Sequence, residues 1–201
     1  MKHQEHEEGK HLLTRETIQY PTLDEAQTDG LDEREAVIEE SITEDGRLLL
    51  YSLDQKQKNQ QATVEIDDQQ IYFTWSENGV TKTQTRRGLE DIVAPSTAIQ
   101  FLLRNFVAIK AAQETPVHLV FPEKRDTLSF KLIPHPHAGR VDIFDIDVIP
   151  TNPFTPMFVG SIYFRMRNKV PRVLEYHGPL MLYRKEQEHW RTVFADVVFD
   201  K

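Results

Sequence analysis

Short stretches in which apolar and polar residues alternate run through most of the chain, and this period of two predicts β-strands. The first such stretch covers residues 12–20. Between residues 36 and 85, strands are predicted on either side of Asp45-Gly46 and of Asn78-Gly79. These two dipeptides supply the positive φ angles that a two-residue hairpin needs. We therefore interpret residues 36–85 as a meander of about five strands.

The hydrophobic period changes after Pro95, where apolar residues recur at helical spacing. Ser96 is a suitable N-cap, and a lysine at the far end of the stripe suits the negative end of a helix. The pattern predicts one amphipathic helix over about residues 97–112. Its stripe consists of Ile99, Leu102, Leu103, Phe106 and Lys110.

Alternation resumes after the predicted helix. The stretch 134–139 (PHPHAG) is expected to be a loop, as is the proline-rich stretch 150–156. In residues 141–149 the alternation changes phase at Ile143-Phe144, and a β-bulge there would place Phe144 and the two aspartates that follow on opposite faces. Strands are predicted over residues 117–121, 128–133, 141–149, 161–166, 172–176, 180–183 and 192–199.

Together these patterns predict a mainly β fold: a single strongly curled antiparallel sheet, or an incomplete barrel, of about eleven strands with one helix. A long meander is expected to curl or close because exposed strand edges invite aggregation. Residues 1–11 are expected to form a flexible acidic leader, and residues 12–201 a single β-rich domain. One face of the sheet should be apolar and dry, and the aromatic residues expected on it are Phe101, Phe106, Phe121, Phe130, Phe144, Phe164 and Tyr176.

The 201 residues carry a formal net charge of −8, and this charge is spread unevenly. Residues 1–46 hold 4 basic and 14 acidic side chains, whereas residues 151–185 hold 6 basic and 1 acidic. An ordinary solvated leader explains this distribution, and so does a leader that shields a basic surface until a partner arrives. The overall acidity argues against nucleic acid as the main partner. No run of about 18 apolar residues occurs, so no membrane-spanning helix is expected.

Residue types exclude several kinds of site. The absence of cysteine excludes disulfides, thiolate metal ligands and a cysteine nucleophile. No hydrolase, zinc-protease or nucleotide-binding motif is present. Glu175 and His177 lie two residues apart, but no serine partner can be placed beside them. We therefore assign no catalytic residue and no cofactor.

Three clusters of polar residues could carry chemistry. His135 and His137 have the spacing of a metal-binding pair, but an ordinary loop is the simpler interpretation, and no metal site is assigned. The cluster of Asp142, Asp145 and Asp147 is best explained as a solvated strand face, because the rest of a calcium loop is missing.

Arg165 and Arg167 share one face of their own strand. They could form ion pairs with Asp145 and Asp147 across the sheet. Alternatively, they could hold an anionic head group, because a guanidinium matches the geometry of carboxylate and phosphate.

Three segments carry a resemblance to a known group. They are STAIQFLLR (96–104), TPVHLVFPEKRDTLSFKL (115–132) and IYFRMRNKVPRVLEYHG (162–178). In this order they resemble exported bacterial β-rich proteins of unknown function, whose folds are similar to lipocalins and periplasmic lipoprotein carriers. The resemblance covers about residues 36–199 and implies an incomplete barrel wrapped on a helix. It implies a periplasmic or envelope-associated address if a signal peptide has been removed, and otherwise the address is cytoplasmic, because residues 1–10 lack an apolar signal segment.

Three functions follow from these patterns. The first is non-enzymatic binding of an apolar or lipid-like ligand in the curled sheet. The second is a structural or interaction protein of the cell envelope that binds a protein partner, and the third is an enzyme using Asp145, Asp147 or His177. For the first function, the expected ligand-binding residues are Arg165, Arg167, Phe106, Phe130, Phe144, Phe164 and Tyr176.

Overall fold

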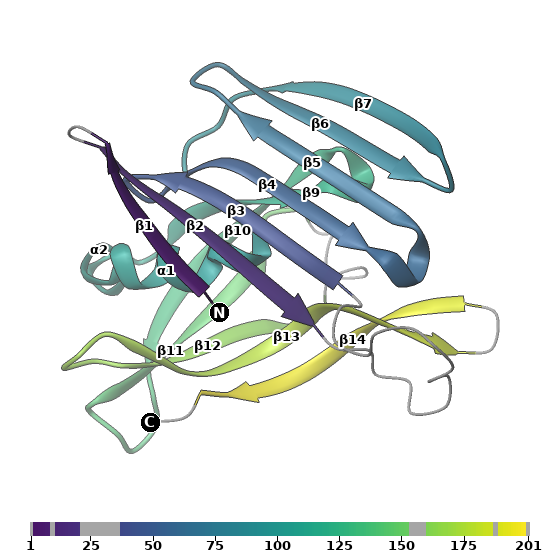
Figure 1. Cartoon of the computed structure of the whole chain (residues 1–201). Helices are drawn as coiled ribbons and strands as arrows, with labels where there is room; N and C mark the ends of the chain where they lie inside the picture. The colour runs from purple at the N-terminus through teal and green to yellow at the C-terminus, as the bar shows by residue number, and fades with distance from the viewer. Residues whose placement is uncertain (1, 9–10, 21–36, 153–159, 187–188, 200–201) are drawn as a thin grey trace. The chain divides into compact units, whose positions relative to one another are not determined.

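The computed structural model describes residues 2–8, 11–20, 37–152, 160–186 and 189–199 (Figure 1). They form two sheets of seven strands each, and one of the sheets is strongly curled into a half-barrel. The first sheet comprises β1 (Lys2–Glu8), β2 (His11–Tyr20), β3 (Val37–Glu44), β4 (Arg47–Gln55), β5 (Gln60–Ile66), β6 (Gln70–Glu77) and β7 (Val80–Arg87). The second comprises β8 (Ile92–Val93), β9 (Thr115–Phe121), β10 (Asp126–Pro136), β11 (Ile143–Pro150), β12 (Ile162–Arg167), β13 (Arg172–Glu186) and β14 (His189–Val198).

The prediction of a mainly β protein with a strongly curled sheet is confirmed. The strands belong to two sheets rather than one, and the chain divides into two compact units. The first unit contains residues 1–98 and 119–127, and the second contains residues 99–118 and 128–201. Residues 2–8, for which the sequence predicts a flexible leader, form β1 and pair with β2.

The first sheet is an antiparallel meander in which every strand pairs with the next one along the chain. Asp45 and Gly46 have φ angles of 48° and 75°, and Asn78 and Gly79 have φ angles of 50° and 79°. These are the positive angles that the sequence predicts for the two hairpins, and both turns are confirmed. Because each strand pairs with the next one along the chain, the order of the strands in this sheet follows their order in the sequence (Figure 1).

The inner face of the first sheet is apolar in β4–β6, where Tyr51, Val64 and Phe73 are buried. In β2 and β3, however, this face is polar, because Glu16 and Glu39 are buried there as well. The expectation of a uniformly apolar, dry face is therefore wrong for this part of the sheet. The hydroxyl of Tyr51 donates to Oε2 of Glu39 at 3.2 Å, which offsets part of the cost of burying that carboxylate.

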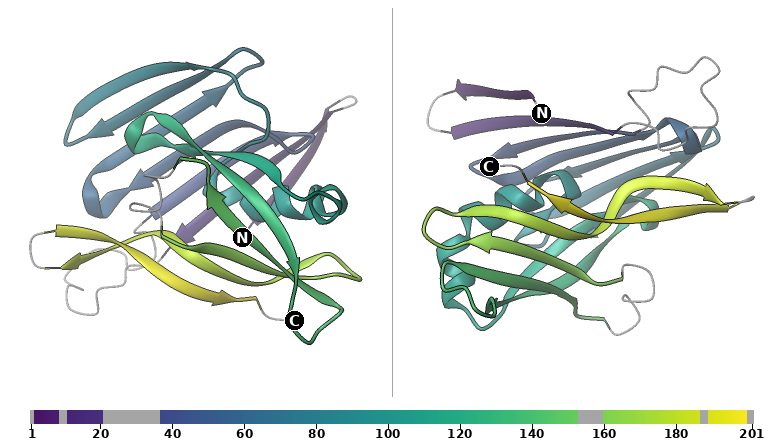
Figure 2. Two further views of the ribbon diagram at one scale, coloured as in Figure 1. Left: turned by 180° about the vertical axis from the view of Figure 1, so that it is seen from behind. Right: turned by 90° about the horizontal axis from the view of Figure 1, so that it is seen from below.

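In the second sheet the chain order is also the spatial order, from β8 at one edge to β14 at the other. β10 continues through His135, so the predicted loop at 134–139 begins later than expected. β11 begins at Ile143, and no bulge is needed to place Phe144 and Asp145 on opposite faces. The two strands predicted at 172–176 and 180–183 are one strand, β13, which forms a long hairpin with β14 (Figure 2). The predicted loop at 150–156 lies partly outside the described residues.

The predicted helix forms as two short segments, α1 (Ala98–Arg104) and α2 (Phe106–Ala111). Asn105 separates them, and its side-chain amide donates to the carbonyl of Phe101 at 3.0 Å. Such local side-chain hydrogen bonds compete with regular helix geometry. Ser96 is not the N-cap, because the helical region starts earlier with a 3₁₀ turn, η2 (Pro95–Thr97), where the backbone N–H of Ala94 donates to Oγ1 of Thr97.

Two further 3₁₀ turns, η1 (Lys56–Lys58) and η3 (Pro122–Lys124), join neighbouring strands. None of the helices in the described ranges is long and apolar enough to cross a membrane.

Candidate functional site

Six of the polar residues that the sequence singles out, His135, Asp145, Asp147, Arg165, Glu175 and His177, come together on one face of the second sheet. In the strand register, His135 lies opposite Asp145, Asp145 opposite Arg165, and Arg165 opposite Glu175. The next row along the strands holds Asp147, Tyr163, His177 and Asp196. Residues two apart in a strand share a face, and these rows therefore form one polar surface across β10–β14. We call it the polar face.

Arg165 lies at the centre of the polar face, between two carboxylates. Its Nε donates to Oδ1 of Asp145 at 2.8 Å, and its Nη1 donates to Oε2 of Glu175 at 2.5 Å. The predicted cross-strand ion pair with an aspartate is thus confirmed. Two of the guanidinium nitrogens are occupied, so an anionic ligand would have to compete with these carboxylates for Arg165.

Asp145 is the most buried carboxylate of the polar face, with 14% of its side chain exposed. Burial alone would raise its pKa, but hydrogen bonds from His137 and Arg165, together with their charge, hold the pKa below its ordinary value. His137 Nδ1 lies 2.7 Å from the second oxygen of this carboxylate. Asp145 therefore stays ionised at neutral pH and links β12 to His137, which directly follows β10.

Two more histidines on the polar face are paired with aspartates. His135 Nε2 lies 3.1 Å from Oδ2 of Asp147, and His177 Nδ1 lies 2.7 Å from Oδ1 of Asp196. The ring of His177 also stacks on Tyr163 with centroids 5.2 Å apart. A histidine–aspartate pair can act as a general base, but it needs a substrate or nucleophile in reach. Among the described residues, no group of three or more potential ligands is arranged to hold a metal ion.

Four of the aromatic residues expected to bind a ligand lie on the other face of the second sheet, and the fifth, Phe106 of α2, packs against it. The Phe106 and Phe144 rings make an edge-to-face contact with centroids 5.2 Å apart, and Phe164 packs against Tyr176 at 4.9 Å. All of these except Tyr176 are buried, as is Phe130. These rings thus contribute to the packed interior.

The structure does not bring the expected arginines and aromatics together. In β12, Phe164 and Met166 are buried, whereas Arg165 and Arg167, which alternate with them in the sequence, are half-buried. The alternation of side chains along a strand therefore places Arg165 on the face opposite Phe164. Arg167 lies opposite Ile143 and Arg172 in the register, away from the carboxylates of the polar face.

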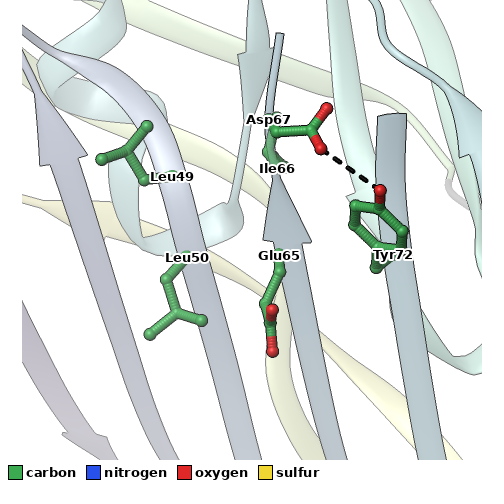
Figure 3. Close-up of a pocket in the computed structure, with 6 residues that line it drawn as sticks. All are labelled: Leu49, Leu50, Glu65, Ile66, Asp67 and Tyr72. Carbon is green, nitrogen blue, oxygen red and sulfur yellow. Dashed lines mark hydrogen bonds between the residues drawn. The ribbon is translucent and has the colours of Figure 1, made fainter. Parts of the chain in front are cut away.

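A surface hollow of about 350 Å³ lies on the first sheet, at the ends of β4, β5 and β6 (Figure 3). Part of its lining is aliphatic, from Leu49, Leu50 and Ile66. Leu50 lies opposite Glu65 in the register. Leu49 is the extra residue of β4 at the register shift, because Ile42 of β3 pairs with Leu50 and Thr43 pairs with Leu48. This irregularity places a second leucine, Leu49, beside Leu50 near the start of β4. The polar part of the lining consists of Glu65, Asp67 and Tyr72.

Asp67 is a fixed carboxylate at the rim of this hollow. One of its oxygens accepts the backbone N–H groups of Gln69 and Gln70 at 2.8 and 2.6 Å, and the other accepts the hydroxyl of Tyr72 at 3.2 Å. The two backbone hydrogen bonds lower its pKa. Partial desolvation and the nearby Asp67 charge raise the pKa of Tyr72, so this phenol stays protonated as a donor.

The charges around the hollow are not balanced. Arg47 pairs with Asp68 and with Glu44, next to the hollow. Glu65 and Asp67 have no ion pair with a basic side chain in the part of the chain that the structure describes. The hollow therefore combines an aliphatic surface with two negative charges that no basic side chain of the described residues neutralises.

No family model, curated protein or solved structure matches this chain.

Sequence reasoning missed the hollow. Its residues belong to strands and a turn that the alternation predicts, but their grouping depends on the register shift between Ile42 and Thr43. The detectable signal was the pair Asp67-Asp68 in a tight turn, since an aspartate at this position often accepts backbone N–H groups two and three residues on. A sequence pattern alone does not place Leu49 beside it.

Proposed function

We propose that this protein is a non-enzymatic binding module, and that the hollow on the first sheet takes a small ligand with an apolar body and a cationic group. The observation that carries this proposal is the fixed Asp67 carboxylate beside an aliphatic surface. The hollow's volume of about 350 Å³ suits a small ligand rather than a whole lipid. The expectation of an apolar ligand is kept, and the expected binding residues move to the first sheet.

The aliphatic residues supply the favourable contact for the apolar body. Leu49, Leu50 and Ile66 are half-buried, so a ligand that covers them removes further apolar surface from water. Each fully buried methylene contributes about 0.8 kcal/mol, and a methylene that this open hollow covers only in part contributes less. The free energy of burying apolar surface does not by itself favour one head group over another.

The charge of the head group follows from Glu65 and Asp67. Asp67 is held ionised by its backbone donors, and the hydroxyl of Tyr72 already donates to it. A carboxylate or phosphate head group would meet like charges here, whereas an ammonium group would be attracted. A fatty acid is therefore a poor ligand for this hollow, and an alkylammonium ion is a good one.

The test compares two ligands of equal chain length and opposite charge. Octylammonium and octanoate are titrated into the protein by isothermal calorimetry at neutral pH and low salt. We expect octylammonium to bind about tenfold more tightly, which corresponds to about 1.4 kcal/mol. Added salt should reduce this difference because the two carboxylates are exposed to solvent.

Variants locate the binding. Asp67→Asn and Glu65→Gln keep the side-chain shapes, and each should weaken octylammonium binding while leaving octanoate binding unchanged or stronger. Glu90→Gln removes an exposed carboxylate that does not line the hollow, and it is the matched control. Equal affinity for the two ligands, or equal losses in Asp67→Asn and Glu90→Gln, would overturn the proposal.

A further inference from the structure

β7 is an edge strand of unusual accessibility. It pairs with β6 through eight consecutive residue pairs without a register shift, and no strand in the described part of the chain pairs with its other edge. Seven of its eight side chains are exposed, and Gln84 is half-buried. Natural proteins often blunt a long edge with a proline, a bulge, a short strand or charged side chains, and of these features β7 has only the charges.

The outer edge of β7 offers a regular row of backbone donors and acceptors. In a two-residue hairpin the residues that flank the turn, here Glu77 and Val80, form a hydrogen-bonded pair. The alternation that follows leaves the N–H and C=O groups of every second residue pointing away from β6. These outward-pointing residues are Thr81, Thr83, Thr85 and Arg87.

The charges of β7 select the kind of strand that fits this edge. Lys82, Arg86 and Arg87 make the segment basic, and it contains no acidic residue. Arg86 already pairs with Asp126, so Lys82 and Arg87 carry the positive charge that an incoming strand would meet. An incoming strand places its side chains beside these, and cross-strand pairs of opposite charge are favourable. A second copy of β7 would instead bring Lys82 and Arg87 against the same basic residues, which disfavours a symmetric dimer through this edge.

We propose that β7 is a docking edge for an extended, acidic segment of a partner protein, which adds to the first sheet as a further strand. Backbone hydrogen bonds supply the affinity in this mode of recognition, and side chains on alternate positions supply the selectivity. The inference rests on the edge and its charges, and it does not depend on the ligand of the hollow.

The test uses two synthetic eight-residue peptides. One alternates valine with glutamate and the other alternates valine with lysine, and binding to the full chain is followed by fluorescence anisotropy of the labelled peptides. We expect the glutamate peptide to bind at least tenfold more tightly than the lysine peptide at low salt. Its binding should slow hydrogen exchange of the amides of Thr81, Thr83 and Thr85.

Two substitutions at one position separate strand addition from simple charge attraction. Thr83→Pro removes an outward N–H that β6 does not use, so the fold tolerates it, while Thr83→Val keeps the N–H. We expect Thr83→Pro to weaken binding of the glutamate peptide at least tenfold and Thr83→Val to leave it unchanged. The variant Lys82→Glu should reduce the preference for the glutamate peptide over the lysine peptide, because it replaces a positive charge beside the incoming strand with a negative one.

Each remaining outcome contradicts the proposal. If both peptides bind equally, charge complementarity does not select the partner. If Thr83→Pro binds as tightly as Thr83→Val, the peptide attaches by its charge and not as a strand. If the glutamate peptide does not bind up to about 1 mM, where the standard free energy of binding is only about −4 kcal/mol, β7 is not a docking edge.

Discussion

Arg165 lies directly opposite Asp145 in the register of β11 and β12, and its Nε donates to the aspartate at 2.8 Å. On its other side the same guanidinium donates to Glu175 of β13. One side chain therefore joins three neighbouring strands. The geometry makes Arg165 a positioning residue of the polar face, whose first role is to hold the second sheet together.

Replacing Arg165 with alanine should lower the free energy of unfolding by about 1–3 kcal/mol, because it leaves a largely buried carboxylate without its charged donor. Urea unfolding followed by fluorescence measures this loss. Arg140→Ala removes an exposed pair with Asp142, and it should cost less than about 0.5 kcal/mol. Equal losses in the two variants would contradict the assigned role of Arg165.

Acid should remove the stabilising contribution of Asp145. Its pKa in the folded protein lies below the ordinary value, so the unfolded chain takes up the proton at higher pH than the folded protein does. The contribution is complete at neutral pH and is lost as the pH falls below about 4. The difference in unfolding free energy between the wild type and Asp145→Asn, measured in urea, should therefore be largest at pH 7 and should shrink as the pH falls below about 4. A difference that stays constant with pH would show that the charge of Asp145 does not contribute.

Gly79→Ala should destabilise the β6–β7 hairpin by about 1–2 kcal/mol. The φ angle of Gly79 is +79°, which a residue with a side chain adopts only with strain. Nothing lies within 4 Å of an added Cβ, so backbone strain is the sole expected cause. Gly79→Asn is the control, because asparagine tolerates this conformation better than alanine. Thermal unfolding of both variants checks the order of stability, and an equal loss would argue against the turn as the cause.

Phe144→Leu should reduce stability by about 1–2 kcal/mol, because it removes the edge-to-face contact with Phe106 from the interior. It should not change the affinity for octylammonium, since neither ring lines the hollow. Calorimetry on the folded variant checks this point. Lost affinity in a folded Phe144→Leu protein would instead support the aromatic face as the ligand-binding surface.

Local signals were enough to predict the class of fold. The Asp45-Gly46 and Asn78-Gly79 turns, and the alternation beside them, identify most strands of the first sheet. The sequence pattern also separates Phe144 from Asp145 correctly, because side-chain direction along a strand follows from alternation alone.

Features that depend on non-local packing were not predictable. In β3, Glu39 faces inward while Ile38 and Ile42 stay half-exposed, so the pairing of β3 with its neighbours outweighs the hydrophobicity of single residues. The break at Asn105 depends on a side-chain hydrogen bond that a helical stripe does not reveal. The division of the strands into two sheets was also not predictable, because the alternation does not show that β7 and β8, which are neighbours in the sequence, do not pair.

The candidate site shows the same limit. The sequence singled out most residues of the polar face but missed Tyr163 and Asp196. It also joined Arg165 to the aromatic residues, although alternation in β12 places them on opposite sides of the sheet. The hollow requires Leu49 and Asp67 to meet at the ends of different strands. The envelope address and the resemblance to lipoprotein carriers stay predictions.

The most direct test of the binding proposal is a titration with octylammonium followed by NMR of labelled methyl groups. We predict that the methyl signals of Leu49, Leu50 and Ile66 shift, while those of Leu132 and Ile146, which are buried in the second sheet, stay unchanged. The shifts should be absent in Asp67→Asn at the same ligand concentration. Shifts confined to Leu132 and Ile146, or no shifts at all, would contradict a ligand site in the hollow.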